Sequence, residues 1–322
     1  MSHGPSEHVS GSHATSGHVS GPIPNPHPPG EEPTIAREPA HDRDDSGAEV
    51  EHVLHRYEAA ATAAFFDAYG EREWTRFEDG RTSTGSLAVH LHYLRRFVRP
   101  GDRVLDAGAG PGRFTIELAR IGARVVVADL SPGQLELNRA KVAEAGCEDA
   151  VLERVVADVC DLSRFPDASF DATVCYGGAL SYVVERAPEA AAELARVTRP
   201  GGHVLVSAMT VAGAILQYPD GVVDLARRDG VAPMEEIVRT GLLPDDPGYG
   251  HLPMQLFRWS ELATILERHG AIVAASSAGL FAAFDPPEQE LRDALLRIEL
   301  DLSAEPGTLD VAPHVLAVVR RA

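Results

Sequence analysis

The stretch from Val104 to Phe114 constrains the fold of this chain more than any other part of its sequence. It begins in a run typical of a buried β-strand, passes through glycines at positions 108, 110 and 112, and continues into a helical pattern. Glycine tolerates positive φ angles and lets a ligand lie against bare backbone. The exposed N–H groups at the start of the next helix favour a carboxylate or a phosphate. The sequence therefore predicts a strand–turn–helix unit that binds a ligand at its turn.

Strands and helices alternate along the chain around this unit. Strands are predicted at 103–106, 124–129, 151–157, 170–175 and 203–207, and helices at 112–121, 132–145 and 187–197. Such alternation predicts an α/β fold with a parallel sheet that helices cover on both faces. A helix at 260–269, a strand at 271–275, a helix at 287–302 and a strand at 311–320 follow. The glycine-containing turn before the last strand allows that strand to return antiparallel.

Residues 1–45 differ in composition from the rest. They are rich in Ser, Gly, Pro and His and contain few large apolar side chains, so they cannot offset their own ordering entropy. We predict a disordered tail at 1–45 and one domain at 46–322. Metal capture by the histidines is an alternative for the tail. A solvated tail is the simpler interpretation, because these histidines share no fixed scaffold.

Two regions of the domain are predicted to surround the cleft rather than build the sheet. Residues 46–99 have a helical pattern ahead of the first strand, and we expect them to form an N-terminal cover. Residues 209–257 contain helical pieces broken by proline and glycine. A segment of this length without a clear sheet element is typical of a functional lid after the fifth strand. The apolar stretch Met254–Trp259 should dock that lid on the body of the domain.

Acidic residues end two of the predicted strands. Asp129 lies 21 residues after Gly108 and could accept both hydroxyls of a ribose. Ser131 already fills the N-cap position of the next helix, which favours the ribose role for Asp129. Asp158 could accept the exocyclic amine of an adenine, or it could simply end its strand. A dinucleotide fingerprint would place its third glycine at position 113, where this chain has arginine, and this weakens a nicotinamide interpretation.

Together these residues resemble the class I S-adenosylmethionine-dependent methyltransferases. Residues 106–112 are similar to the family's first motif, Asp-x-Gly-x-Gly-x-Gly. The other matching residues are Asp129 for the ribose acid, Asp158-Val159 for the adenine-contacting pair, Phe170-Asp171 for the fourth motif, and 199–203 for the turn before strand five. The resemblance covers residues 100–208 closely and the elements after 259 loosely.

The resemblance implies a fold, a cofactor and a set of binding residues. The fold is a Rossmann-like, seven-stranded, mostly parallel sheet with an antiparallel last strand. The cofactor is S-adenosylmethionine, lying across strands one to four. The binding residues that it implies are Asp106, Gly108, Gly110, Gly112, Asp129, Leu130, Asp158, Val159, Cys175 and Tyr69. For Tyr69, in the predicted cover, a core helix that packs on the sheet is an equally simple interpretation.

Composition excludes several classes of partner. The net charge of −19 argues against nucleic acid or an anionic membrane surface, because both require a basic footprint. The three cysteines form no Cys-x-x-Cys, so neither a disulfide framework nor a metal site is predicted. No apolar run is long enough to cross a bilayer, and no secretory signal is recognisable. We expect a cytoplasmic protein whose oligomeric state the sequence leaves open.

The expected function is methyl transfer from S-adenosylmethionine to a small or medium-sized molecule, such as a secondary metabolite. The alternatives are an NAD(P)-dependent oxidoreductase and a non-catalytic cofactor-binding partner subunit. The sequence leaves open whether oxygen, nitrogen or carbon is methylated. If the acceptor must lose a proton, His251 is the candidate base, because imidazole titrates near neutrality and this residue lies in the presumed lid. A surface histidine on the lid is the competing interpretation.

Overall fold

The computed structural model describes residues 56–75, 84–245, 251–281, 286 and 288–322. The chain divides into two units, Met1–His52 and Val53–Ala322, and every described residue belongs to the second. The predicted tail at 1–45 lies outside the described residues. No helix in the described ranges is long and apolar enough to cross a membrane.

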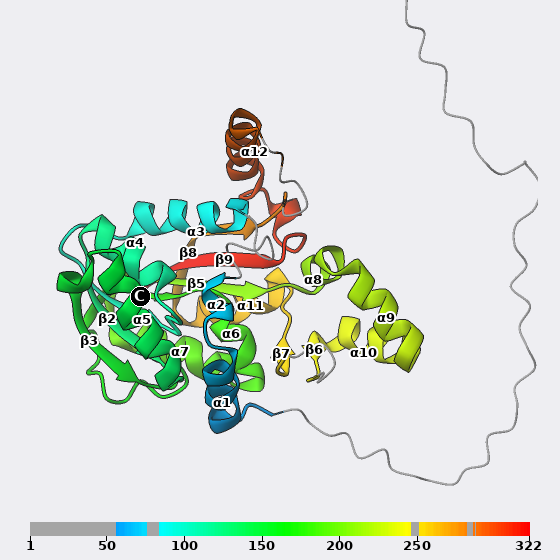
Figure 1. Cartoon of the computed structure of the whole chain (residues 1–322), viewed down its shortest axis with the longest axis horizontal. Helices are drawn as coiled ribbons and strands as arrows, with labels where there is room; N and C mark the ends of the chain where they lie inside the picture. Colours follow the sequence, from blue (N-terminus) through cyan, green and yellow to red (C-terminus); the bar gives the residue numbers. More distant parts are fainter. Residues whose placement is uncertain (1–55, 76–83, 246–250, 282–285, 287) are drawn as a thin grey trace, which may run out of the picture. The chain divides into compact units, whose positions relative to one another are not determined.

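A seven-stranded sheet forms the centre of the second unit, with the strand order β3-β2-β1-β4-β5-β9-β8 (Figure 1). The strands are β1 (Arg103–Ala107), β2 (Arg124–Asp129), β3 (Val151–Val156), β4 (Phe170–Cys175), β5 (Thr198–Met209), β8 (Gly270–Ala278) and β9 (His314–Arg321). Strands β1 to β5 pair in parallel. Strand β9 pairs antiparallel with β5 on one side and with β8 on the other. The predicted Rossmann-like sheet with an antiparallel last strand is confirmed.

Helices cover both faces of the sheet because successive strand residues point to opposite sides. In β1, Val104 packs into one apolar layer and Leu105 into the other. The first layer contains α3 (Thr84–Phe97), α4 (Arg113–Ile121) and α5 (Pro132–Glu144). The second contains α6 (Ala179–Tyr182), α7 (Ala187–Val197) and α11 (Trp259–Leu266). The valine run of β2 feeds both layers, as expected for a strand without a solvent-facing side.

Two strand boundaries differ from the sequence prediction. Strand β5 begins at Thr198, because the Pro200-Gly201-Gly202 segment stays in the sheet instead of forming a turn before it. The pairing of β4 with β5 shifts register between Phe170 and Ala172, which accommodates these residues as a bulge. Strand β9 begins only at His314, since Pro313 has no N–H to donate to a neighbouring strand.

Two short helices precede the sheet layers, α1 (Ala59–Tyr69) and α2 (Arg72–Thr75). The Asp67 carboxylate at the end of α1 accepts a hydrogen bond from the Ser131 hydroxyl at 2.5 Å and one from the Gly133 amide at 2.8 Å. The Gln134 side chain donates to the Phe66 and Gly70 carbonyls at 2.9 and 3.1 Å. These contacts dock α1 on the N-terminal end of α5, where backbone N–H groups favour a carboxylate.

The segment after β5 forms three helices and a small sheet. These elements are α8 (Val211–Gln217), α9 (Pro219–Asp229), α10 (Val231–Thr240), β6 (Leu242–Leu243) and β7 (Met254–Gln255), with β6 and β7 antiparallel. The segment ends where it began, because Thr210 and Phe257 form a β-bridge and the Phe257 amide donates to the Met209 carbonyl at 2.7 Å. Met254, Leu256 and Phe257 are buried, as predicted for the docking stretch. The last helix, α12 (Gln289–Leu302), lies against α3 (Figure 1).

Candidate functional site

A cavity of about 1030 Å³ opens at the carboxyl ends of the parallel strands. Its floor comes from the loops that follow β1, β2, β3 and β4, and from the start of β9. Residues of α1 and α2 line one side, and residues of α8, α9, α10 and β6 line the other. The carboxyl ends of parallel strands are the usual ligand site in open α/β sheets. We call this cavity the cleft.

The glycine turn after β1 presents bare backbone to the cleft. Gly108 and Gly110 both line it and adopt φ angles of +68° and +52°, which side chains rarely tolerate. A β-carbon added to Gly108 would stand 2.7 Å from the β-carbon of Ala179, so no larger residue fits there. Gly112 has a different role, because it caps α4 and a β-carbon on it would meet the Asn138 side-chain amide at 2.9 Å. Gly112 does not itself line the cleft.

The Asp129 carboxylate lies in the cleft floor at the end of β2. It accepts the backbone amide protons of Gly110 and Ser131, each at 2.8 Å, and its residue is 8% exposed. Burial raises the pKa of Asp129 to about 6, although backbone hydrogen bonds from Ser131, Gly110 and Leu130 oppose that rise. A carboxylate can accept about four hydrogen bonds, so these backbone donors still leave capacity for ligand hydroxyls. Leu130 lines the cleft directly beside it.

Two predicted binding residues lie behind the cleft surface. The Asp106 carboxylate accepts the Thr115 hydroxyl proton at 2.6 Å and is 1% exposed. Burial raises the pKa of Asp106 to about 7. Cys175 is fully buried at the end of β4, and burial raises the pKa of its thiol to about 12. Neither residue lines the cleft, so each supports the floor from beneath.

The end of β3 contributes apolar surface rather than a carboxylate. Ala157 and Val159 line the cleft, but Asp158 does not. The Asp158 carboxylate accepts the Cys160 amide proton at 2.8 Å and lies 3.9 Å from the Arg186 guanidinium. Burial and then the nearby Asp158 raise the pKa of Tyr57. The Asp158 side chain is therefore already engaged with Tyr57 and Arg186.

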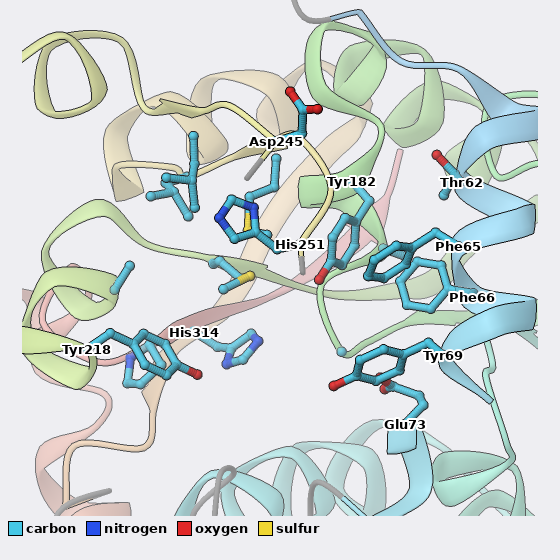
Figure 2. Close-up of a pocket in the computed structure, with 18 of the residues that line it drawn as sticks. Thr62, Phe65, Phe66, Tyr69, Glu73, Tyr182, Tyr218, Asp245, His251 and His314 are labelled. Carbon is cyan, nitrogen blue, oxygen red and sulfur yellow. The ribbon is translucent and has the colours of Figure 1, made fainter. Parts of the chain in front are cut away.

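Aromatic side chains from α1 face the cleft. In Figure 2, Phe65, Phe66 and Tyr69 project from α1 towards Tyr182. The Phe65 and Tyr69 rings stack with centroids 5.6 Å apart, and the Phe66 ring meets that of Tyr182 edge-on at 5.2 Å. No residue of α1 is buried, which is inconsistent with a core helix packed on the sheet. Tyr69 and its neighbours therefore form a wall of the cleft.

Histidine and tyrosine provide polar groups on the lid side. His251 lines the cleft just ahead of β7, with its Nδ1 3.1 Å from the Leu252 carbonyl oxygen. His314 also lines the cleft and was not predicted from the sequence. Tyr176, which follows β4, is 3% exposed, and its hydroxyl has no hydrogen-bond partner among the described residues. Its ring contacts that of His90 edge-on at 4.8 Å.

Strand order separates the cleft into two halves. The residues at the cleft edge follow the order Asp129, Gly108, Tyr176, Met209 and His314, from β2 through β1, β4 and β5 to β9. Adjacent strands lie about 4.8 Å apart, so roughly 14 Å separates the positions on β1 and β9. We call the part over β2, β1 and β4 the turn half, and the part over β5 and β9 and beneath α8 to α10 the lid half. Within the described ranges, no group of three or more His, Cys, Asp or Glu residues is placed to hold a metal ion.

Comparisons with known proteins show which proteins this chain is similar to. Residues 105–206 match the family model described as a methyltransferase domain. The chain is 44% identical over 107 residues to demethylmenaquinone methyltransferase of Clavibacter sepedonicus, covering 33% of this chain and 40% of that protein. It is 36% identical over 149 residues to methyltransferase GfsG of Streptomyces halstedii, covering 45% of this chain and 51% of that protein. The chain thus spans about half or less of the length of these relatives.

A solved structure extends the likeness beyond the matched segment. The cyclase SpnF superposes with a TM-score of 0.55 at 17% identity, covering 83% of this chain and 97% of that chain. At this identity the likeness shows the fold alone. The similarity therefore includes elements after β5 as well as the strands around the glycine turn.

Proposed function

We propose that this chain, whose residues 105–206 match the methyltransferase-domain model, is a class I S-adenosylmethionine-dependent methyltransferase that transfers a methyl group from S-adenosylmethionine to a small molecule. One observation carries the proposal. The bare backbone of Gly108–Gly110 and the buried carboxylate of Asp129 lie together in the turn half of the cleft. This half suits the methyl donor. The lid half of the same cleft offers a place for the acceptor.

The residues of the turn half fit S-adenosylmethionine. Asp129 has acceptor capacity for ribose hydroxyls, and Leu130, Ala157 and Val159 offer apolar surface for the adenine. The Gln134 side-chain oxygen is buried and has no hydrogen-bond partner among the described residues. It lies 4.0 Å from the position of a β-carbon built on Gly110, directly behind the glycine turn. Glu73 adds an acid that suits a cationic ligand.

When bound, S-adenosylmethionine supplies an electrophilic methyl group, and the acceptor atom bonds to the methyl carbon while the carbon–sulfur bond breaks and its electron pair stays on sulfur. The chain's own task is to hold the acceptor in line and to exclude water. An acceptor hydroxyl also loses its proton. We assign that proton to His251, which stands in the lid half of the cleft. His314 enters the same half from β9 and is the comparison residue for this assignment.

The relatives support a small acceptor. One of them is named for demethylmenaquinone, a small molecule rather than a macromolecule. The net charge of −19 also disfavours nucleic acid as acceptor. A nicotinamide cofactor is the competing occupant of the turn half, and a protein that binds cofactor without turnover is the competing function.

Calorimetry tests the donor assignment. S-adenosylmethionine and S-adenosylhomocysteine should both bind, whereas NADH and NADPH should not. Asp129→Ala should weaken binding about 10- to 150-fold, the scale of losing hydrogen bonds to a charged group worth roughly 1.5–3 kcal/mol. Asp149→Ala, which changes an exposed aspartate outside the cleft, is the matched control and should bind as the wild type does. Equal affinity of the Asp129→Ala variant would refute the assignment.

Turnover separates a methyltransferase from a silent binding protein. The full chain should transfer label from methyl-labelled S-adenosylmethionine to small molecules in a cell extract from which macromolecules have been removed. Binding of the cofactor without labelled product in any such extract would favour the non-catalytic alternative.

A further inference from the structure

We propose that the lid half of the cleft takes an acceptor with an extended, uncharged apolar body and one hydroxyl-sized polar group that faces the floor. This inference rests on the proposed function, because it names the substrate class of the same site. Four features of the lid half carry it: its size, its apolar walls, its charges and its polar floor.

The cleft is larger than a single ligand requires. Pockets that bury one drug-sized ligand measure about 300–1,000 Å³, and this cleft measures about 1030 Å³. A nucleoside-sized cofactor in the turn half therefore leaves room for a second molecule beside it. The remaining space extends along three helices and the β6–β7 ribbon, which suits a long acceptor better than a compact one.

The walls of the lid half are apolar, and among the described residues most of their side chains are only partly buried. Side chains from α8, α9, α10, β6 and β7 line it, including Ile215, Val222, Leu225, Ile237, Leu243 and Met254. Helices α9 and α10 contain no buried residue, so the apolar sides that they turn to the cleft remain accessible. An amphipathic helix normally buries its apolar side against a core. Here the cleft takes the place of that core, and an apolar acceptor would complete the burial.

The charges around the cleft do not suit an anionic acceptor. Within the described lining, the basic side chains other than histidine are those of Arg113 and Arg228. Arg113 donates to the Trp74 carbonyl at 3.3 Å, and Arg228 donates to the Asp229 carboxylate of its own helix at 2.7 Å. Recognition of a phosphate or carboxylate usually needs charged donors directed at its oxygens. Both guanidinium groups already have protein partners, so we infer an acceptor without phosphate, sulfate or carboxylate groups.

The inner end of the lid half is polar. Tyr176, which follows β4, stands at the boundary between the two halves and is 3% exposed. The His314 ring lies 6.0 Å from the His90 ring, which in turn contacts Tyr176. Figure 2 shows His314 directed into the cleft. A single hydroxyl or enol of the acceptor that reaches this floor would meet the His314 imidazole at the start of β9, next to the turn half.

A matched pair of fluorescent probes tests the class of acceptor. N-phenylnaphthylamine is neutral, and anilinonaphthalene sulfonate carries an anionic group on the same skeleton. The neutral probe should bind the full chain in the presence of saturating S-adenosylhomocysteine. The sulfonated probe should bind at least about tenfold more weakly under the same conditions. Equal affinity for the two probes, or displacement of the neutral probe by S-adenosylhomocysteine, would overturn the proposal.

Two Ile237 variants and a control variant of α10 locate the probe. Ile237→Asp places a charge in the apolar wall and should weaken binding of the neutral probe at least about tenfold. Val231→Asp, on the same helix but 60% exposed and outside the lining, is the matched control and should leave it unchanged. Ile237→Trp fills the space without adding charge and should also weaken the probe. Unchanged probe binding in both Ile237 variants would place the probe elsewhere and contradict the proposal.

The same samples distinguish failure of the proposed function from failure of the inference about the acceptor. If the wild type fails to bind S-adenosylhomocysteine, the proposed function fails. If it binds S-adenosylhomocysteine but does not prefer the neutral probe, only the inference about the acceptor fails. Calorimetry of both Ile237 variants with S-adenosylhomocysteine shows whether the turn half and the fold are intact.

Discussion

The guanidinium carbon of Arg113 lies 3.7 Å from the centre of the Trp74 ring, so the first residue of α4 stacks on a residue of α2. The Lys141 ammonium lies 5.0 Å from the centre of the same ring and 2.5 Å from the Glu71 carboxylate. Two cations thus hold α2 against α4 and α5. Arginine occupies the position where a dinucleotide fingerprint has its third glycine, and here it fastens a wall of the cleft.

Loss of this stack should loosen the wall and weaken cofactor binding. Arg113→Ala should raise the Kd for S-adenosylhomocysteine about 2- to 30-fold, corresponding to a cation–π contribution of roughly 0.5–2 kcal/mol. Arg96→Ala is the control, since Arg96 lies over the Phe97 ring at 5.3 Å on α3 and outside the cleft. Calorimetry on both variants decides the matter, and equal affinities would show that the stack does not support the site.

Cofactor affinity should depend on pH through Asp129. Burial raises the pKa of this carboxyl to about 6, and only the ionised form offers all its oxygens as acceptors to ribose hydroxyls. S-adenosylmethionine should therefore bind more tightly as the pH rises from 5 to 7 and should reach a plateau above that range. Asp129→Asn should bind weakly at every pH and show a flatter profile. Calorimetry across this range tests the prediction, and an unchanged pH profile in the variant would contradict it.

Asp106 should make the fold less stable as the pH rises. Burial raises the folded-state pKa of Asp106 from 3.8 to about 7. A carboxyl group whose pKa is higher in the folded state than in the unfolded state stabilises the folded state while it is protonated. Its contribution to the free energy of unfolding is complete below the pKa of the unfolded state and is lost as the pH rises to the pKa of the folded state. About three pKa units correspond to a loss on the order of 4 kcal/mol between pH 4 and 7. Urea unfolding at several pH values should show that Asp106→Asn reduces this fall.

The control for that measurement is Asp149→Asn, which changes an exposed aspartate on the surface. Its unfolding free energy should follow the wild-type pH dependence. If Asp106→Asn also keeps the wild-type dependence, buried ionisation of Asp106 is not the cause.

His251 should affect turnover without affecting cofactor binding. His251→Gln should lower kcat about 10²- to 10⁴-fold for a hydroxyl acceptor, the usual scale of a general base, and should leave the affinity for S-adenosylhomocysteine unchanged. His314→Gln should mainly raise the KM for the acceptor. The opposite pattern, with the loss of kcat in His314→Gln, would assign the proton to His314.

The sheet could be predicted from the sequence because its signals are local. The strand predicted at 124–129 from its valine run has the same limits as the observed β2, Arg124–Asp129. The glycine turn follows β1, as predicted. The pairing of Ser131 with the Gln134 amide at the start of α5 was also predictable from the residues at that position. Each of these features is determined by a few consecutive residues.

The rest of the site depends on contacts between distant parts of the chain. Asp67, Gln134 and Trp74 have no local pattern that marks them, since their partners are far away in sequence. His314 had a usable signal, because the first residue of an antiparallel strand lies at the carboxyl edge of its parallel neighbours. Asp106 matches the first motif of the family. Because successive strand residues point to opposite faces of the sheet, its side chain lies beneath the cleft floor, where it accepts from Thr115.

Thr210 and Phe257 lie side by side, so the lid leaves and rejoins the sheet at almost one point. The strand pairing on either side does not depend on what the chain does between them. A stretch of sequence inserted in this way can be exchanged as a whole, in length and in chemistry, while β5 and β9 keep their register. The sheet and the lid can therefore change at different rates during evolution. For an engineer, the bridge between Thr210 and Phe257 marks where one lid can be cut out and another grafted in.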